Sequence, residues 1–96
     1  MKTLREEILL AQQEGRAIGH FNVGNMEMVV AVVNVVRSTG LPAIIGVSEG
    51  ERDAFGVAQI KALVDSYKAE GLPVYLNADH TYSVERVKEA IDAGYD

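Results

Sequence analysis

Hydrophobic residues divide the chain into longer segments that suit helices and shorter apolar segments that suit strands. Four segments are predicted to be helices: residues 3–15, 25–40, 55–71 and 83–96. In most of them apolar side chains recur three and four positions apart, which places them on one helical face. Three shorter segments between them are predicted to be strands: residues 16–24, 41–50 and 72–79. The expected order is therefore one helix followed by three strand–helix pairs.

Polar caps and glycines mark the ends of the predicted helices. Thr3 and Glu6 have the spacing of a capping box, while Asn25 and Ser83 are typical N-cap residues. A glycine ends each helical segment: Gly15, Gly40, Gly71 and Gly94. The valine-rich segment 25–40 suits a strand by propensity, but its length and polar interruptions favour a buried helix. The last helix is expected to turn three apolar residues inward: Val84, Val87 and Ile91.

The strand segments are typical of a parallel α/β protein. Residues 43–47 form a continuous apolar run, which indicates burial on both faces of a sheet. The sequences GLPAIIGVSEG and GLPVYLNADHT repeat one rhythm about thirty residues apart, the length of one βα unit. Alternating strands and helices predict a parallel sheet with right-handed crossovers. Periodicity leaves open whether this sheet closes into a barrel.

Composition and charge limit the size of the domain and the kinds of partner and metal site that the chain can have. A chain of 96 residues with 48% hydrophobic residues makes one small domain, or part of a larger one. A net charge of -5 argues against sequence-independent binding of nucleic acid. The absence of cysteine excludes disulfides and thiolate metal sites. Charged residues interrupt the N-terminal segment and every apolar stretch is short, so neither a signal peptide nor a membrane partner is expected, and the expected location is the cytoplasm.

Polar residues follow each predicted strand, where the active sites of parallel α/β folds form. The three strand ends carry Phe21-Asn22, Ser48-Glu49 and Asn77-Ala78-Asp79-His80. Asp79 has the chemistry of a general acid or base, and His80 that of a base or a metal ligand. The alternative is that Asp79 only begins the turn into the last helix and His80 is only exposed. The strand-end position makes both interpretations reasonable.

Other polar residues near these strand ends favour structural interpretations. The GVSEG turn has amides that suit phosphate, but without a full glycine-rich signature a flexible loop is favoured. Glu49, Glu51 and Asp53 match no metal-loop spacing and are expected to form a solvated acidic loop. His20 lies inside the first strand and is interpreted as structural. Asn22 suits either a ligand contact or a strand-end hydrogen bond.

Three stretches together resemble the N-terminal part of class II fructose-bisphosphate aldolases: AIGHFNVGNMEMVVAVV, LPAIIGVSEG and LPVYLNADHTYSVERVKEAIDAGYD. That family typically has Phe-Asn after its first strand and Ser-Glu-Gly or Ser-Asn-Gly after its second. Asp-His follows its third strand, before a helix that ends in Asp-Ala-Gly and an aromatic residue. All three motifs occur here in order, and the resemblance covers essentially the whole chain.

The resemblance implies a (β/α)8 TIM barrel and the reversible cleavage of fructose 1,6-bisphosphate into dihydroxyacetone phosphate and glyceraldehyde 3-phosphate. It implies that Asp79 is the general acid/base on the C4 oxygen and that His80 is a ligand of the catalytic Zn²⁺. It also implies that Ser48 contacts the phosphorylated sugar substrate and that Asn22 lines the same pocket. Proton donor and metal ligand are then neighbours because both act beside the developing enediolate.

The length of the chain departs from the family pattern. A TIM barrel needs about 250 residues and eight strands, whereas three strands are predicted here. Residues 1–96 are therefore expected to be the N-terminal segment of the barrel, with no second domain and with further zinc ligands beyond residue 96. Alone the segment is expected to be inactive and to self-associate as a homo-oligomer or pair with the rest of the barrel. The alternatives are an aldolase for tagatose 1,6-bisphosphate and a non-catalytic α/β assembly or ligand-binding module.

Overall fold

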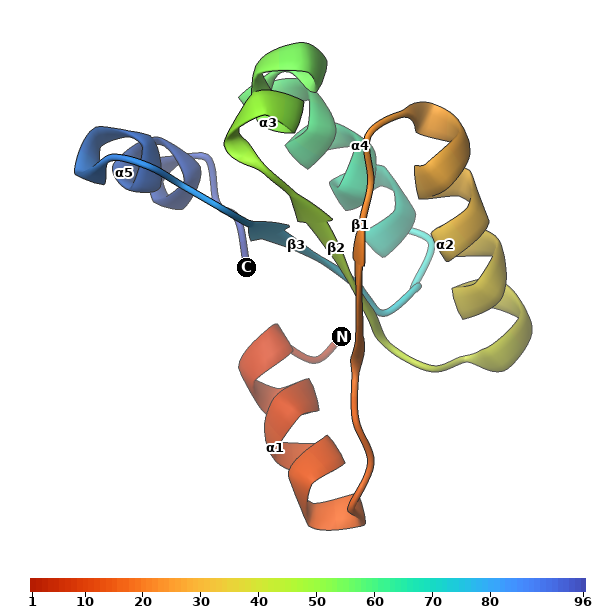
Figure 1. Ribbon diagram of the computed structural model, residues 1–96. Helices are drawn as coiled ribbons and strands as arrows, with labels where there is room; N and C mark the ends of the chain where they lie inside the picture. Colours follow the sequence, from red (N-terminus) through yellow and green to blue (C-terminus); the bar gives the residue numbers. More distant parts are fainter.

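The computed structural model describes all 96 residues, and its helices and strands alternate along the chain (Figure 1). The elements are α1 (Leu4–Glu14), β1 (Gly19–Asn22), α2 (Met26–Thr39), β2 (Ala43–Val47), α3 (Glu49–Phe55), α4 (Val57–Lys68), β3 (Val74–Ala78) and α5 (Val84–Asp92). No helix reaches the length and apolar character that a membrane-crossing segment needs.

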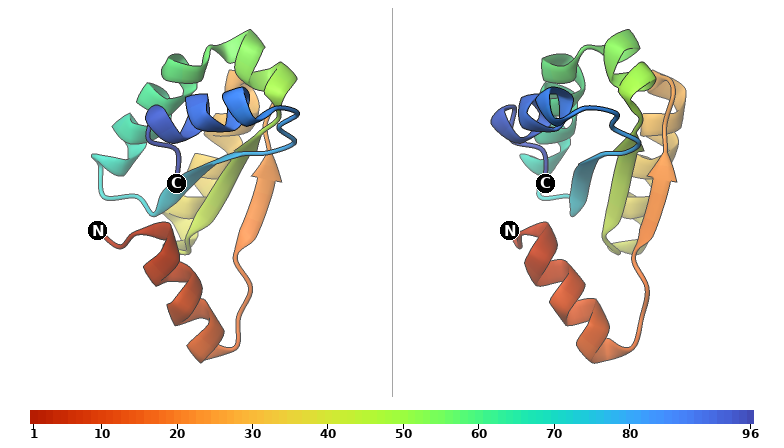
Figure 2. Two further views of the ribbon diagram at one scale, coloured as in Figure 1. Left: turned by 90° about the vertical axis from the view of Figure 1, so that its left-hand side faces the viewer. Right: turned by 60° about the vertical axis from the view of Figure 1, so that its left-hand side comes forward.

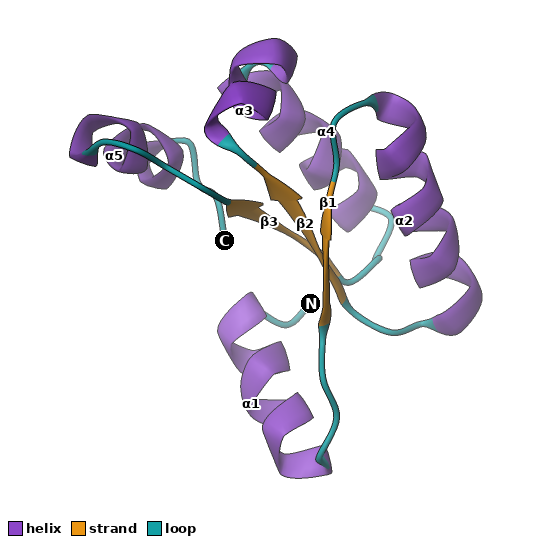
Figure 3. Ribbon diagram, in the orientation of Figure 1, coloured by secondary structure: helices purple, strands orange, loops and turns teal.

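The three strands form one parallel sheet in the order β1-β2-β3, which confirms the predicted α/β class (Figure 3). One row across the sheet aligns His20, Ile44 and Tyr75. Two residues closer to the carboxyl edge, a second row aligns Asn22 and Gly46 with Asn77. Since alternate residues of a strand point to opposite faces, these two rows share one face.

The opposite face of the sheet carries the hydrophobic core. Helices α2 and α4 cover this face (Figures 1 and 2). Ile45 of β2 and Leu76 of β3 are fully buried there, together with Val33 of α2 and Val64 of α4. Because both helices and both strands belong to one buried cluster, the positions of the strand ends are fixed by this packing.

Helix α1 lies apart from the other helices, at the end of the sheet where the strands begin (Figure 2). It is joined to β3 by the buried Tyr75, whose single hydroxyl proton is shared between the Lys2 carbonyl (2.8 Å) and the Glu7 carboxylate (3.1 Å). Burial and the neighbouring Glu7 carboxylate raise the pKa of Tyr75, so its hydroxyl stays a proton donor. The helix is therefore attached at the end of the sheet opposite the candidate site.

The predicted helix caps are confirmed. Thr3 and Glu6 form the reciprocal capping box of α1, and the Asn25 side chain accepts from the amide of Met28 at the start of α2. The Ser83 hydroxyl accepts from the Arg86 amide at the start of α5. These side chains satisfy amides that have no partner within the helix, which stabilises each helix start by about 1 kcal/mol.

The prediction of a flexible acidic loop after β2 is wrong. Residues Glu49–Phe55 form the helix α3, and Ser48 and Glu51 form its capping box. A separate helix, α4, begins only at Val57, after Gly56 with a φ of 91°. Ser48 and Glu51 are three residues apart, like the box at the start of α1, and this was the available signal. The short helix has no apolar period, so a search for periodicity misses it.

The expected inward face of α5 is in fact exposed. Val84, Val87 and Ile91 have exposed fractions of 67%, 43% and 65%, and Ala90 is the only buried residue of this helix. Strand β1 is also exposed along its whole length. The helical period was predicted correctly, but no other element of this chain covers the apolar side of α5. The exposure of β1 is typical of an open sheet edge.

Candidate active site at the carboxyl edge of the sheet

The four candidate residues all lie at the carboxyl edge of the sheet. Asn22 is the last residue of β1, Ser48 follows β2 directly, and Asp79 and His80 follow β3. The register aligns Asn22 with Gly46, and Val47 with Ala78, so the three strands end at similar heights. The strand-end rule therefore predicted the placement of these residues correctly, although their roles remain predictions.

The Glu51 carboxylate joins Asn22 to Ser48. One carboxylate oxygen accepts from the Asn22 side-chain amide at 2.9 Å, and the other accepts from the Ser48 backbone amide at 2.8 Å. The Ser48 hydroxyl in turn accepts from the Glu51 amide at 3.4 Å. Helix α3 thus orients two of the candidate residues through one side chain that the sequence analysis had assigned to solvent.

Glu51 is held in its charged form. Partial burial acts to raise its pKa, but the backbone amide and hydroxyl of Ser48 and the amide of Asn22 together lower it more. The nearby His80 adds a smaller lowering effect. The net result is a pKa below the usual value, so Glu51 accepts hydrogen bonds at neutral pH and is not a proton donor.

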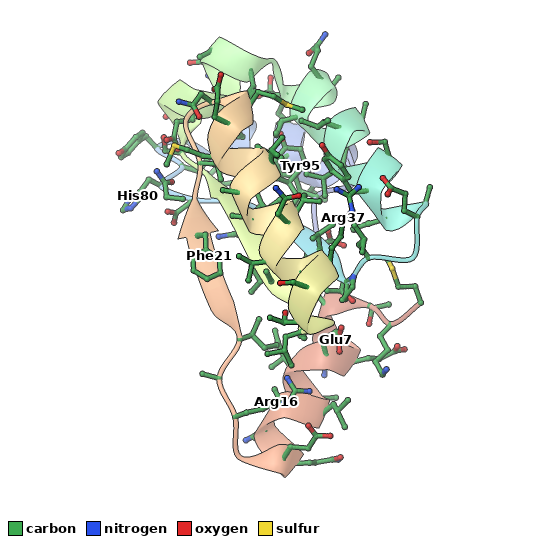
Figure 4. All side chains as sticks on the ribbon, turned by 90° about the vertical axis from the view of Figure 1, so that its right-hand side faces the viewer. Glu7, Arg16, Phe21, Arg37, His80 and Tyr95 are labelled. Carbon is green, nitrogen blue, oxygen red and sulfur yellow. The ribbon has the colours of Figure 1, made fainter.

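Asp79 and His80 lie side by side after β3. The Asp79 amide donates to the Val47 carbonyl at 2.9 Å, which continues the pairing of β3 with β2. The Asp79 carboxylate lies 3.6 Å from the His80 ring nitrogen Nε2, and their side chains are 31% and 69% exposed. Figure 4 shows His80 directed outward at this edge. Both groups are therefore accessible to a small molecule above the sheet.

The backbone at His80 adopts an unusual conformation. Its φ is 43°, the only positive value at a residue other than glycine. This left-handed conformation costs such a residue about 1–2 kcal/mol. The His80 carbonyl accepts from the amide of Glu49 at 3.3 Å, which links this turn to α3. Strained residues are frequent at functional sites, where neighbouring contacts hold them in place.

A buried arginine beneath the site was not recognised in the sequence. Arg52 of α3 has an exposed fraction of 0%. Its Nη1 donates to the carbonyls of Val47 (2.6 Å) and Asp79 (3.0 Å), and its Nη2 donates to the Thr81 hydroxyl (2.9 Å). The signal in the sequence was an arginine four residues after the helix cap Ser48, but an arginine there usually faces solvent. Arg52 connects the ends of β2 and β3.

His20 lies on the same sheet face as Asn22. Its side chain is exposed and is not part of the hydrophobic core. Its Nε2 lies 3.1 Å from the Asn77 side-chain amide, and the ring crosses over Gly46 of the central strand. A Cβ at Gly46 would approach the His20 ring to 2.2 Å. A side chain at this position would therefore require the exposed His20 ring to move away from the strand.

The metal-binding capacity of these residues is limited. The chain contains no group of three or more histidine, aspartate or glutamate side chains that is arranged to hold a metal ion. A catalytic zinc requires about three protein ligands. Asp79 and His80 form a pair, so residues 1–96 alone do not fit a complete zinc site.

Comparison with known proteins identifies the family. The sequence profile described as "Fructose-bisphosphate aldolase class-II" matches residues 2–96. The chain belongs to the class II fructose-bisphosphate aldolase family. This agrees with the resemblance in the Phe-Asn, Ser-Glu-Gly and Asp-His motifs.

Curated members of this aldolase family are similar to the chain along nearly its whole length. A probable fructose-bisphosphate aldolase of Bacillus subtilis is 36% identical, and a fructose-bisphosphate aldolase of Staphylococcus aureus (strain Mu50) is 34% identical. Each alignment covers 97% of this chain and 34% of the relative. The chain thus spans about a third of the length of the curated aldolases it matches.

Solved structures support the same fold. The YdjI aldolase of Escherichia coli K12 superimposes with a TM-score of 0.84 at 26% identity, over 98% of this chain and 37% of that protein. A putative fructose-1,6-bisphosphate aldolase of Coccidioides immitis gives a TM-score of 0.80 over 91% of this chain and 33% of that protein, and at 22% identity it supports the fold alone. The parallel βα units are consistent with the N-terminal part of a TIM barrel, as the sequence predicted.

Proposed function

We propose that the protein catalyses the reversible aldol cleavage of fructose 1,6-bisphosphate to dihydroxyacetone phosphate and glyceraldehyde 3-phosphate. The observation that supports this most is the position of Asp79 and His80 directly after β3, at the edge that also holds Ser48 and Asn22, in a class II aldolase chain. Within this proposal, residues 1–96 are the N-terminal segment of the barrel. The expected location is the cytoplasm.

Asp79 is proposed to move the proton at the substrate's C4 oxygen. In the cleavage direction its carboxylate takes the proton from the C4 hydroxyl, and the C4 oxygen becomes the aldehyde oxygen of glyceraldehyde 3-phosphate. The C3–C4 bond breaks, and its electron pair stays on the dihydroxyacetone phosphate part as an enediolate. The partial exposure of Asp79 allows contact with the substrate while the Asp79 amide stays paired with Val47.

Ser48 and Asn22 are proposed to bind the phosphorylated sugar. In the Asn22–Glu51 contact the Asn22 amide nitrogen is the donor, which leaves its oxygen available to accept from a sugar hydroxyl. The Ser48 hydroxyl accepts from the Glu51 amide and still has a proton to donate. Both side chains are oriented by Glu51, so their polar atoms are arranged before the substrate arrives.

His80 is proposed to contribute one ligand of a catalytic Zn²⁺. A bound zinc would stabilise the negative charge of the enediolate as a Lewis acid. The pair of Asp79 and His80 is too small to hold zinc alone, so the proposal expects further ligands beyond residue 96. Residues 1–96 by themselves are accordingly expected to show no turnover.

A coupled assay of aldol cleavage tests the proposed function. The full protein, supplied with zinc, is expected to cleave fructose 1,6-bisphosphate and to lose this activity after treatment with a chelator. Tagatose 1,6-bisphosphate, which differs in the configuration at C4, is assayed in parallel. Cleavage of the tagatose sugar only would assign the alternative substrate, and cleavage of neither would reject the aldolase proposal.

A non-catalytic assembly module is the second candidate, and exposed apolar side chains favour it. They occur on several elements: Ile8 and Leu9 of α1, Phe21 of β1, Val35 of α2, and Val84, Val87 and Ile91 of α5. Such surfaces favour association, either as a homo-oligomer or with the rest of a barrel. Neither nucleic acid nor a membrane is proposed as a partner.

Light scattering on residues 1–96 tests this association. We expect a mass above that of the 10.4 kDa monomer, because isolated sheet edges and apolar helix faces bury area when copies associate. Replacing Val84 and Ile91 by serine is expected to lower the associated fraction, while replacing the exposed Lys88 of the same helix by serine is the matched control. A stable monomer with cooperative unfolding would contradict the proposal.

A further inference from the structure

We propose that Arg52 is a positioning residue, which holds the turn after β3 so that Asp79 and His80 point toward the substrate. The inference rests on the proposed roles of these two residues. Arg52 itself is fully buried, and it contacts the turn through the Asp79 carbonyl and the Thr81 hydroxyl. No feature of the aldolase motifs in this sequence assigns it a role.

Arg52 contacts the residues on both sides of His80. Its Nη1 binds the carbonyl of Asp79, the residue before His80, and its Nη2 binds the hydroxyl of Thr81, the residue after it. The same Nη1 also binds the Val47 carbonyl, which anchors the guanidinium to the end of β2. The planar fork of arginine is suited to this task because its donors have fixed directions.

The conformation between these two contacts is one that His80 would not adopt freely. With a φ of 43°, His80 has the left-handed backbone that residues other than glycine rarely adopt. Its carbonyl is bound by the Glu49 amide. Three consecutive residues of the turn are thus held from α3, two of them by Arg52. A strained residue persists only when its surroundings determine its conformation, and Arg52 supplies most of these contacts.

Packing alone does not explain a charged residue at this position. The guanidinium is buried without a carboxylate partner, and its Nε has no hydrogen-bond partner. Burying such a charge is costly, and an apolar side chain of similar volume would fill the space at lower cost. What the guanidinium provides is a defined geometry. It binds the Val47 carbonyl after β2 together with the Asp79 carbonyl and the Thr81 hydroxyl after β3, so the ends of the two strands are held together. A misplacement of about 1 Å in a reacting group is enough to reduce turnover about 100-fold.

A first experiment measures coupling between Arg52 and the strained backbone, and it does not depend on aldolase activity. In the full protein, Arg52→Met is combined with His80→Gly, because glycine adopts the left-handed conformation without strain. We expect Arg52→Met to raise the unfolding equilibrium constant about tenfold less in the parent than in the His80→Gly background, because release of the turn relieves the backbone strain of His80 only in the parent. Arg86→Met is the matched control, since the Arg86 side chain is partly exposed and binds side chains only. Its effect should be equal in both backgrounds.

A second experiment measures catalysis with Arg52→Lys and Arg52→Met. Arg52→Met is expected to lower kcat about 100-fold with KM changed less than threefold, because the acid/base group is displaced while substrate contacts remain. Arg52→Lys should recover part of kcat, since it keeps the charge but not the fork. Arg86→Met should leave kcat unchanged.

The two experiments separate failure of this inference from failure of the proposed function. Equal effects of Arg52→Met in the parent and the His80→Gly background would overturn the positioning role, and so would an unchanged kcat. If the parent cleaves neither sugar bisphosphate, the proposed function is rejected. The unfolding measurements then still decide whether Arg52 holds the turn. If Arg52→Met does not fold, Arg52→Lys replaces it in the same cycle, with a smaller coupling expected.

Discussion

Replacement of Asp79 by alanine is expected to lower kcat for cleavage of fructose 1,6-bisphosphate by about 10³-fold, within the usual range for loss of a general acid/base. The carboxylate is the only acidic side chain that directly follows β3, and its amide is paired to Val47. The substitution removes the proton acceptor but leaves this backbone pairing. KM should change little, and the zinc content of the full protein should stay normal.

Two further measurements make the Asp79 prediction specific. Asp79→Asn keeps the shape of the side chain but cannot accept the proton at neutral pH, so its kcat should be as low as that of Asp79→Ala. Glu49→Gln is the matched control and should keep a normal kcat, since Glu49 lies at the same edge and its carboxylate pairs with Arg86. Normal turnover in Asp79→Asn, or a zinc content that falls with kcat, would count against the proton-transfer role.

The location of the candidate site was predictable because it follows from general features of parallel sheets. The apolar run Ala43–Val47 indicated a strand buried on both faces. Ser48 is the next residue, so it was expected at the carboxyl end of that strand. The same reasoning placed Asn22 and Asp79 at the ends of their strands. Local patterns were sufficient here because the sheet brings equivalent positions together without further information.

The contacts that orient the site were not predictable in this way. Glu51 was expected to be solvated, yet it joins Asn22 to Ser48, and Arg52 was not singled out although it binds the carbonyl of Asp79. Both residues lie on α3, which is too short to show a hydrophobic period. Some hydrogen-bond partners of Glu51 and Arg52 are 29 residues away in sequence. The directions of these two side chains therefore depend on tertiary packing.

The exposed side of α5 illustrates a second limit of sequence patterns. The spacing of Val84, Val87 and Ile91 correctly predicted an amphipathic helix. A hydrophobic period shows which side of a helix favours burial, but it does not show which element will cover that side. Within this chain only Ala90 of the helix is buried, and the apolar side remains accessible to a partner surface.

Replacement of His80 by alanine is expected to cause loss of zinc from the full protein, with an affinity reduced by more than about 100-fold. Changes to residues that merely support metal ligands already cost about 10–100-fold, so removal of a ligand should cost more. The His80 side chain is 69% exposed, and its ring makes no hydrogen bond to the backbone. The fold should therefore persist, and circular dichroism should be unchanged.

His20→Ala is the control that makes the loss of zinc informative. Both histidines are exposed, but their rings have different neighbours. The His20 ring lies over Gly46 and is within hydrogen-bond distance of the Asn77 side-chain amide, whereas the His80 ring lies beside the Asp79 carboxylate. Elemental analysis should find normal zinc in His20→Ala and in Asp79→Ala, and little zinc in His80→Ala. Equal loss in Asp79→Ala and His80→Ala would mean that both side chains bind the metal, and the separate roles of proton carrier and ligand would then have to be abandoned. Normal zinc in His80→Ala would place the ligands elsewhere and reject the role of His80 as a zinc ligand.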